Sequence, residues 1–147
     1  MRNEAMQQLD VLIGTWQTTM RNAWFLQPPD LEVPGSATVE WLSDAFVIFR
    51  WTMQGDVGDA TSEMVLVLGR NDAHDAYTAL YHDERGVCRV FAMTFDGSHW
   101  ELSREDPDMF QRFIADVRSD RISGRWEASE DRGESWRKDF DLVFDRA

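Results

Sequence analysis

Three histidines and one cysteine are the side chains of this chain whose types most often perform chemistry. No two of His74, His82 and His99 stand at a short, ligand-like spacing, so no metal site is expected. Cys88 lies in the apolar run Val87–Phe91, where a small buried side chain is the ordinary interpretation. No nucleophile elbow, phosphate loop or dinucleotide fingerprint is present. These residues therefore indicate no catalytic centre.

Two polar side chains fall among apolar ones and are better candidates for binding. Lys138 and Gln111 each stand between apolar residues two positions away on either side. A buried cation or amide needs a partner, because leaving it unpaired costs several kcal/mol. Glu40 is one possible partner and a ligand carboxylate is another, while Arg50 is a rival anchor that alternation turns toward solvent. Lys138 could also extend to water with only its stem buried.

Aromatic residues are more numerous than a small core requires. They recur at apolar positions: Trp41, Phe49, Trp51, Tyr77, Tyr81, Phe91, Phe113, Trp126 and Phe140. In a closed sheet they either fill the interior or line an apolar pocket, and we favour a pocket. The predicted ligand-binding residues are Trp41, Trp51, Tyr81, Gln111, Phe113, Lys138 and Phe140.

These residues lie on strand-like segments that follow one short helix. Apolar residues at helical spacing predict a helix over 3–12, ended by Gly14. About ten period-two segments follow, separated by turn residues: 14–20, 36–43, 45–53, 62–70, 76–82, 87–95, 98–104, 109–119, 121–129 and 134–145. The longest break, Arg21–Pro34, holds Trp24 and Phe25 and is expected to cross one end of the fold as a lid.

Alternation along the segments predicts how the sheet is built. In the last segment Trp136, Lys138, Phe140, Leu142 and Phe144 share one face, and acidic or basic residues occupy the other. One apolar face repeated through antiparallel strands with short turns describes a meander, and closure removes its two exposed edges. We predict an all-β fold, a single antiparallel up-and-down barrel of about ten strands over residues 1–147.

Motifs at both ends of the chain carry a family resemblance. Gly14-Thr15-Trp16 resembles the Gly-x-Trp signature of lipocalins and other calycins, in which the Trp closes the barrel floor against a basic residue near the chain end. Arg146 is placed for that role. The octet Ser129–Trp136 resembles an Asp-box, which is best known from sialidase propellers. One copy in so short a chain indicates a locked hairpin rather than a propeller.

Further turns, Asp83–Gly86 and Asp96-Gly97 followed by Trp100, are similar to those of an uncharacterised bacterial family with a calycin-like barrel. The resemblance implies a fold and a tendency to bind ligands, but no activity. Nitrobindin-type haem barrels are more distantly similar. Their glycines after the Gly-x-Trp are replaced here by Gln17–Met20, and no His follows His99. No cofactor is therefore expected, haem included.

Composition restricts the possible partners. The net charge of −12 argues against nucleic acid and anionic membranes, and no apolar run approaches the length of a membrane span. The N-terminus lacks the apolar core of a secretory signal, and a lone cysteine cannot form an internal disulfide. These features predict a cytoplasmic protein.

The leading hypothesis is a barrel that binds a small, largely apolar molecule, with a carboxylate as an option. A second hypothesis is a calycin-type cyclase, isomerase or decarboxylase using Glu40, Tyr81 or His82 as acid or base. A third is a solid-core interaction module, forming a homodimer through tryptophan-bearing faces. The sequence leaves all three open.

Overall fold

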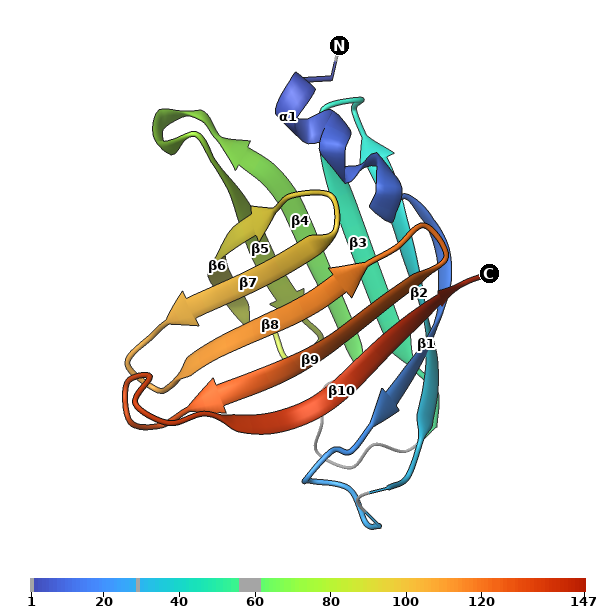
Figure 1. The fold of residues 1–147 in the computed structure, drawn as a ribbon, viewed down its shortest axis with the longest axis vertical. Helices are drawn as coiled ribbons and strands as arrows, with labels where there is room; N and C mark the ends of the chain where they lie inside the picture. Colours follow the sequence, from blue (N-terminus) through green and yellow to red (C-terminus); the bar gives the residue numbers. More distant parts are fainter. Residues whose placement is uncertain (1, 29, 56–61) are drawn as a thin grey trace.

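A closed antiparallel barrel of ten strands forms the fold, shown by a computed structural model that describes residues 2–28, 30–55 and 62–147 (Figure 1). The helical elements are α1 (Glu4–Gln7), the 3-10 helix η1 (Gln8–Leu12) and the 3-10 turn η2 (Asp72–His74). The strands are β1 (Gly14–Arg21), β2 (Val33–Leu42), β3 (Phe46–Met53), β4 (Glu63–Asn71), β5 (Ala76–Asp83), β6 (Cys88–Phe95), β7 (His99–Glu105), β8 (Phe110–Val117), β9 (Arg121–Ser129) and β10 (Arg137–Arg146).

Each strand pairs with its neighbours in sequence, and β1 pairs with both β2 and β10, so the sheet has no free edge strand. Burial alternates along the strands because successive side chains point to opposite faces of the sheet. This confirms the predicted fold class. The predicted helix also exists, but its second half is 3-10 rather than α.

One end of the barrel, here called the helix end, is closed by the N-terminal segment. Asn3 caps α1 by accepting a hydrogen bond from the Ala5 amide at 2.8 Å, and the helical segment buries Met6, Leu9 and Leu12. The Trp16 indole donates to the Leu12 carbonyl at 2.9 Å. The helix end is therefore both hydrogen-bonded and filled with apolar side chains.

Arg146 completes this closure in the way that the Gly-x-Trp resemblance predicts. Its guanidinium carbon lies 4.0 Å from the centre of the Trp16 ring, and its nitrogens donate to the carbonyls of Val11, Ile13 and Ser119. The close approach explains Gly14, since a Cβ there would lie 2.4 Å from Arg146 Nη1. Through Arg146, the last strand, β10, thus contacts the first strand, β1, at the helix end of the barrel.

The opposite end, here called the hairpin end, contains the octet that joins β9 to β10. Asp131 accepts hydrogen bonds from the Ser129 hydroxyl and from the amide and hydroxyl of Ser135. The Gly133 amide donates to the Ser129 hydroxyl at 2.8 Å, and Gly133 adopts a positive φ of 88°. Arg112 stacks on the Trp136 ring at 3.8 Å. The octet is a locked turn, as its spacing predicts.

A register shift in β10 corrects one detail of the predicted alternation. Lys138 pairs with Glu127 and Phe140 pairs with Trp126, with a β-bulge between the two pairs. The bulge reverses the side-chain parity, so Lys138 is exposed and forms an ion pair with Asp141 at 3.1 Å instead of sharing the face of Phe140.

Within the described residues, no helix has the length and apolar character needed to cross a membrane.

Candidate functional site

The interior of the barrel is lined by aromatic side chains from strands on all sides. Phe49 of β3 contacts Trp100 of β7 and Phe144 of β10, with ring centres 5.9 and 5.7 Å apart. Phe113 lies 5.2 Å from both Trp100 and Trp126. The Phe49 contacts cross the barrel and the Phe113 contacts join neighbouring strands, so the helix half and the middle layer form a packed core. The half nearer the hairpin end is therefore the candidate site.

Five of the seven predicted ligand-binding residues lie on the interior side of the barrel. Trp51 stacks against Phe140 at 6.5 Å, while Tyr81 and Phe113 are buried and Gln111 is half-buried. The Trp51 indole donates to the Thr18 hydroxyl at 2.9 Å, which fixes the orientation of its ring. Trp51, Tyr81, Gln111 and Phe140 thus lie toward the hairpin end, whereas Phe113 belongs to the packed middle layer.

The other two predicted residues lie elsewhere. Trp41 belongs to the helix end, where its indole donates to Asp10 and Arg2 stacks on its ring at 4.2 Å. Lys138 is on the outer surface, paired with Asp141. A single ligand in the hairpin half would therefore contact neither side chain.

Tyr81 is the inner member of a polar network at the hairpin end. Its hydroxyl donates to Asp83 at 2.8 Å, and Arg85 donates to both oxygens of the same carboxylate. Burial, together with the bond to Asp83, raises the pKa of Tyr81 to about 12. Burial alone would raise the pKa of Asp83, but the bonds from Arg85 and Tyr81 outweigh it and hold that pKa at about 2. Tyr81 is thus protonated at neutral pH.

Arg104 forms a second network, which the sequence analysis did not anticipate. It is an interior residue of β7, only 4% exposed, and its Nε donates to Gln111 at 2.9 Å. Its other nitrogens donate to Asp106 and Asp108. Burial would lower the pKa of Arg104, but the two carboxylates outweigh that effect and raise it. The amide of Gln111 is therefore already engaged.

Arg89 is a further interior residue that the sequence analysis missed. It alternates with the buried residues Phe91, Met93 and Phe95 on β6, so its side chain starts from the inner face of the sheet. Its guanidinium lies 5.8 Å from the centre of the Tyr81 ring. Within residues 2–28, 30–55 and 62–147 it makes no ion pair and no side-chain hydrogen bond. The sequence does indicate this placement, because Arg89 alternates in step with Phe91, Met93 and Phe95 and therefore points to the same face.

The residues suggested as general acids or bases are placed differently from one another. Glu40 pairs with Arg50 at 2.6 Å on the outer surface, and His82 has the outward parity of β5. Only Tyr81 faces the interior, and its raised pKa makes it a poor base near neutrality. Within the described ranges, no group of His, Cys, Asp and Glu residues could hold a metal ion.

The segment between β1 and β2 lies against the hairpin half. One residue of this segment, Pro29, is outside the described residues. Ala23 and Leu26 are buried, and the Phe25 ring meets Phe140 edge-on at 6.0 Å. Trp24 turns outward instead, and its indole donates to Asp139 at 3.1 Å. Phe25 thus packs on Phe140, and Leu26 belongs to the buried core.

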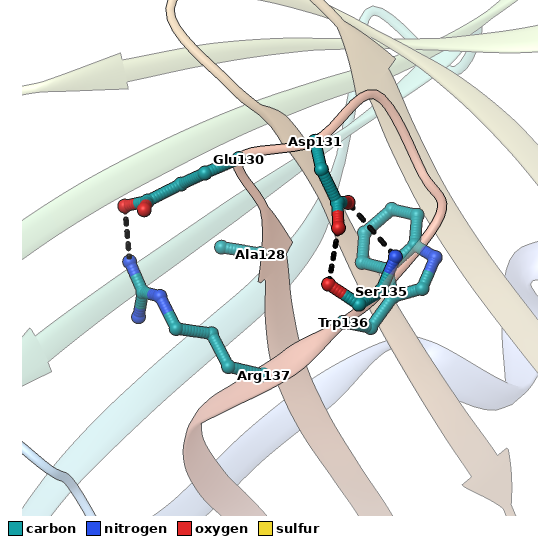
Figure 2. Close-up of a pocket in the computed structure, with 6 residues that line it drawn as sticks. All are labelled: Ala128, Glu130, Asp131, Ser135, Trp136 and Arg137. Carbon is teal, nitrogen blue, oxygen red and sulfur yellow. Dashed lines mark hydrogen bonds and ion pairs between the residues drawn. The ribbon is translucent and has the colours of Figure 1, made fainter.

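A pocket of about 310 Å³ lies beside the octet, lined by Ala128, Glu130, Asp131, Ser135, Trp136 and Arg137 (Figure 2). Its polar groups bond to one another: Glu130 pairs with Arg137 at 3.6 Å, and Asp131 accepts from Ser135. Because the Asp131 bonds also form the locked turn, the pocket is explained by hairpin structure.

Comparisons with known proteins support the fold alone. No family model matches the chain, and no curated protein matches it. Among solved structures, the chain is similar to Rv2717c from M. tuberculosis, with a TM-score of 0.68, 14% identity, and coverage of 100% of this chain and 99% of that one. A de novo designed fluorescence-activating β-barrel matches at a TM-score of 0.48 and 14% identity, covering 99% of each chain. The likeness to Rv2717c spans both chains, and at this identity it supports only a common fold.

Proposed function

We propose that this protein binds a small, largely apolar molecule that carries a carboxylate, in the hairpin half of the barrel interior. The observation that carries the proposal is Arg89, whose side chain starts on the inner face of β6 and has no polar partner among the described residues. Its guanidinium lies beside the Tyr81 ring. Arginine presents several donors in a fixed fork that matches a carboxylate. An arginine placed in this way is suited to hold an acidic group.

The apolar part of the ligand would lie against the aromatic side chains of the same half. Trp51 and Phe140 offer a stacked pair of rings, and Phe25 packs at the edge of that pair. Each 100 Å² of apolar ligand surface removed from water contributes about 2.5 kcal/mol. Affinity would come mainly from this burial, and Arg89 would orient the ligand.

The lack of a bound carboxylate distinguishes Arg89 from Arg85 and Arg104, the arginines of the two polar networks at this end. Arg85 is bound to Asp83, and Arg104 is bound to Asp106 and Asp108. A ligand carboxylate would have to displace those acids to reach either guanidinium. At Arg89 it would meet a cation that no described acid compensates, so Arg89 replaces Lys138 as the proposed anchor.

Fluorescence titration with cis-parinaric acid and with its methyl ester tests this proposal. A charge-assisted hydrogen bond contributes about 1.5–3 kcal/mol, so we expect the acid to bind at least about tenfold more tightly than the ester. Arg89→Met replaces the guanidinium with an apolar side chain of similar length. It should remove the preference for the acid while leaving ester binding nearly unchanged.

The matched control is Arg125→Met, which removes an arginine from the outer surface of β9. It should bind both probes as the unmodified protein does. If neither probe binds, the interior is not a ligand site for this class of molecule. If the ester binds but the preference for the acid survives in Arg89→Met, the interior binds ligands and Arg89 is not the anchor.

A further inference from the structure

The outer surface of β4, β5 and β6 has an uncharged and largely apolar centre. Its central outward positions are alternate residues: 65 to 69 on β4, 78 to 82 on β5 and 88 to 92 on β6. None of these nine positions holds Asp, Glu, Lys or Arg, in a chain that is 29% charged. We call this surface the β4–β6 face.

An apolar row runs across the centre of the β4–β6 face. The strand register places Val67 opposite Leu80, and Leu80 opposite Val90. On the adjoining strand Ile48 continues the row, where it is 7% exposed. Exposure then increases to 38% at Leu80 and 63% at Val90. The row is thus covered at its β3 end and uncovered toward β6.

The outer surfaces of β7, β8 and β9 carry charges. β7 has Glu101, β8 has Asp116 and β9 has Arg121 and Arg125, all on the outer side of their strands. The central outward positions of β1 and β2 are uncharged as well, but they are mostly polar: Thr15, Gln17, Thr19, Pro34, Ser36 and Thr38. The combination of no charge with an apolar row is therefore what distinguishes the β4–β6 face. Exposed, contiguous apolar surface of this kind commonly marks an interaction site.

We infer that the β4–β6 face is covered by a second copy of this chain, packed face to face about a two-fold axis near Leu80. Two molecules of net charge −12 repel each other, and the nine positions of this face place no Asp, Glu, Lys or Arg in the contact. A basic partner would be drawn to the acidic surfaces instead. Leu80 occupies the central position of the face, so a two-fold axis there places it against its own symmetry mate.

The size of the face sets the expected strength of the dimer. With strands about 4.8 Å apart and outward residues about 6.7 Å apart along each strand, nine positions cover roughly 300 Å² on each copy. Stable interfaces bury about 800 Å² on each partner, so the β4–β6 face predicts a weak, reversible dimer rather than a permanent one. The monomer and the dimer should therefore interconvert with concentration.

Sedimentation velocity over a concentration series from about 5 to 500 μM tests the inference. The weight-average mass should rise from 17.1 kDa toward twice that value. Leu80→Arg places two like charges against each other at the centre of the contact and should hold the mass at that of the monomer. Ser123→Arg adds the same charge to the outer side of β9 and should dimerise as the unmodified protein does.

Thermal unfolding at the lowest concentration verifies that both variants are folded. Concentration-dependent amide shifts in NMR spectra provide a second readout, and they should be confined to residues near Leu80 and Val90. A protein that stays monomeric throughout the series would overturn the inference, as would a Leu80→Arg variant that dimerises as readily as Ser123→Arg. Either result is independent of ligand binding in the interior.

Discussion

Gly124→Ala probes how tightly the barrel interior is packed around Phe113. An added Cβ at Gly124 would lie 2.6 Å from two carbons of the Phe113 ring and 3.1 Å from the Ala115 Cβ. The ring has little room to move, because Trp100 and Trp126 each lie 5.2 Å from its centre. Overpacking of this kind costs about 1–3 kcal/mol, and the stiffer unfolded chain offsets about 0.4–1 kcal/mol of that. We expect a net loss of about 1–2 kcal/mol.

Urea unfolding at low protein concentration measures this loss, and the melting temperature should fall by roughly 2–8 °C. Gly69→Ala is the matched control, because a Cβ there meets nothing within 4 Å. That variant should be as stable as the unmodified protein, or up to about 1 kcal/mol more stable. If Gly124→Ala proves as stable as Gly69→Ala, the Phe113 ring has free space beside it and the packed middle layer is an incorrect description.

Contacts at the two ends of the barrel give three further predictions. Arg146→Met removes three hydrogen bonds to carbonyls and the stacking on Trp16, so it should lower the free energy of unfolding by about 1–2 kcal/mol, and an unchanged urea midpoint would contradict this role. Because the folded-state pKa of Asp83 is lowered to about 2, its contribution of about 1 kcal/mol, reduced for solvent screening, should be present above about pH 4 and lost as the pH falls toward 2. Acid titration against Asp83→Asn measures it, and a stability difference that stays constant down to pH 2 would be inconsistent with the lowered pKa. Trp51→Phe leaves the Thr18 hydroxyl without its indole donor and should cost about 1 kcal/mol in urea unfolding, whereas a more stable variant would exclude a structural role for that bond.

The sequence was sufficient to predict the barrel, because the information lies in local patterns. Gly14 and Trp16 begin β1, and period-two alternation and turn residues mark the ten strands. The pairing of Trp16 with Arg146 follows from the family resemblance and is confirmed by their contact. In each of these cases, the residues nearby in sequence favour the same local structure that the complete fold adopts.

Predictions about the site were less complete, for two physical reasons. Strand parity assumes an unbroken register, and the bulge after Lys138 reverses it, so Lys138 faces outward. Parity also does not indicate which end of a barrel a residue occupies, which is why Trp41 was grouped with Trp51 although it packs at the helix end. Arg89 was overlooked because Cys88 and Val90, its neighbours on the outer face, are themselves apolar and obscure the alternation.

The most direct test of the proposed site is an NMR titration that observes the arginine Nε–H and tryptophan indole N–H signals. With cis-parinaric acid, the Arg89 and Trp51 signals should shift together, while the indole signal of Trp41 at the helix end stays in place. The methyl ester should shift Trp51 and leave Arg89 unchanged. An Arg89 signal that the acid leaves in place while Trp51 shifts would contradict its assignment as the carboxylate anchor.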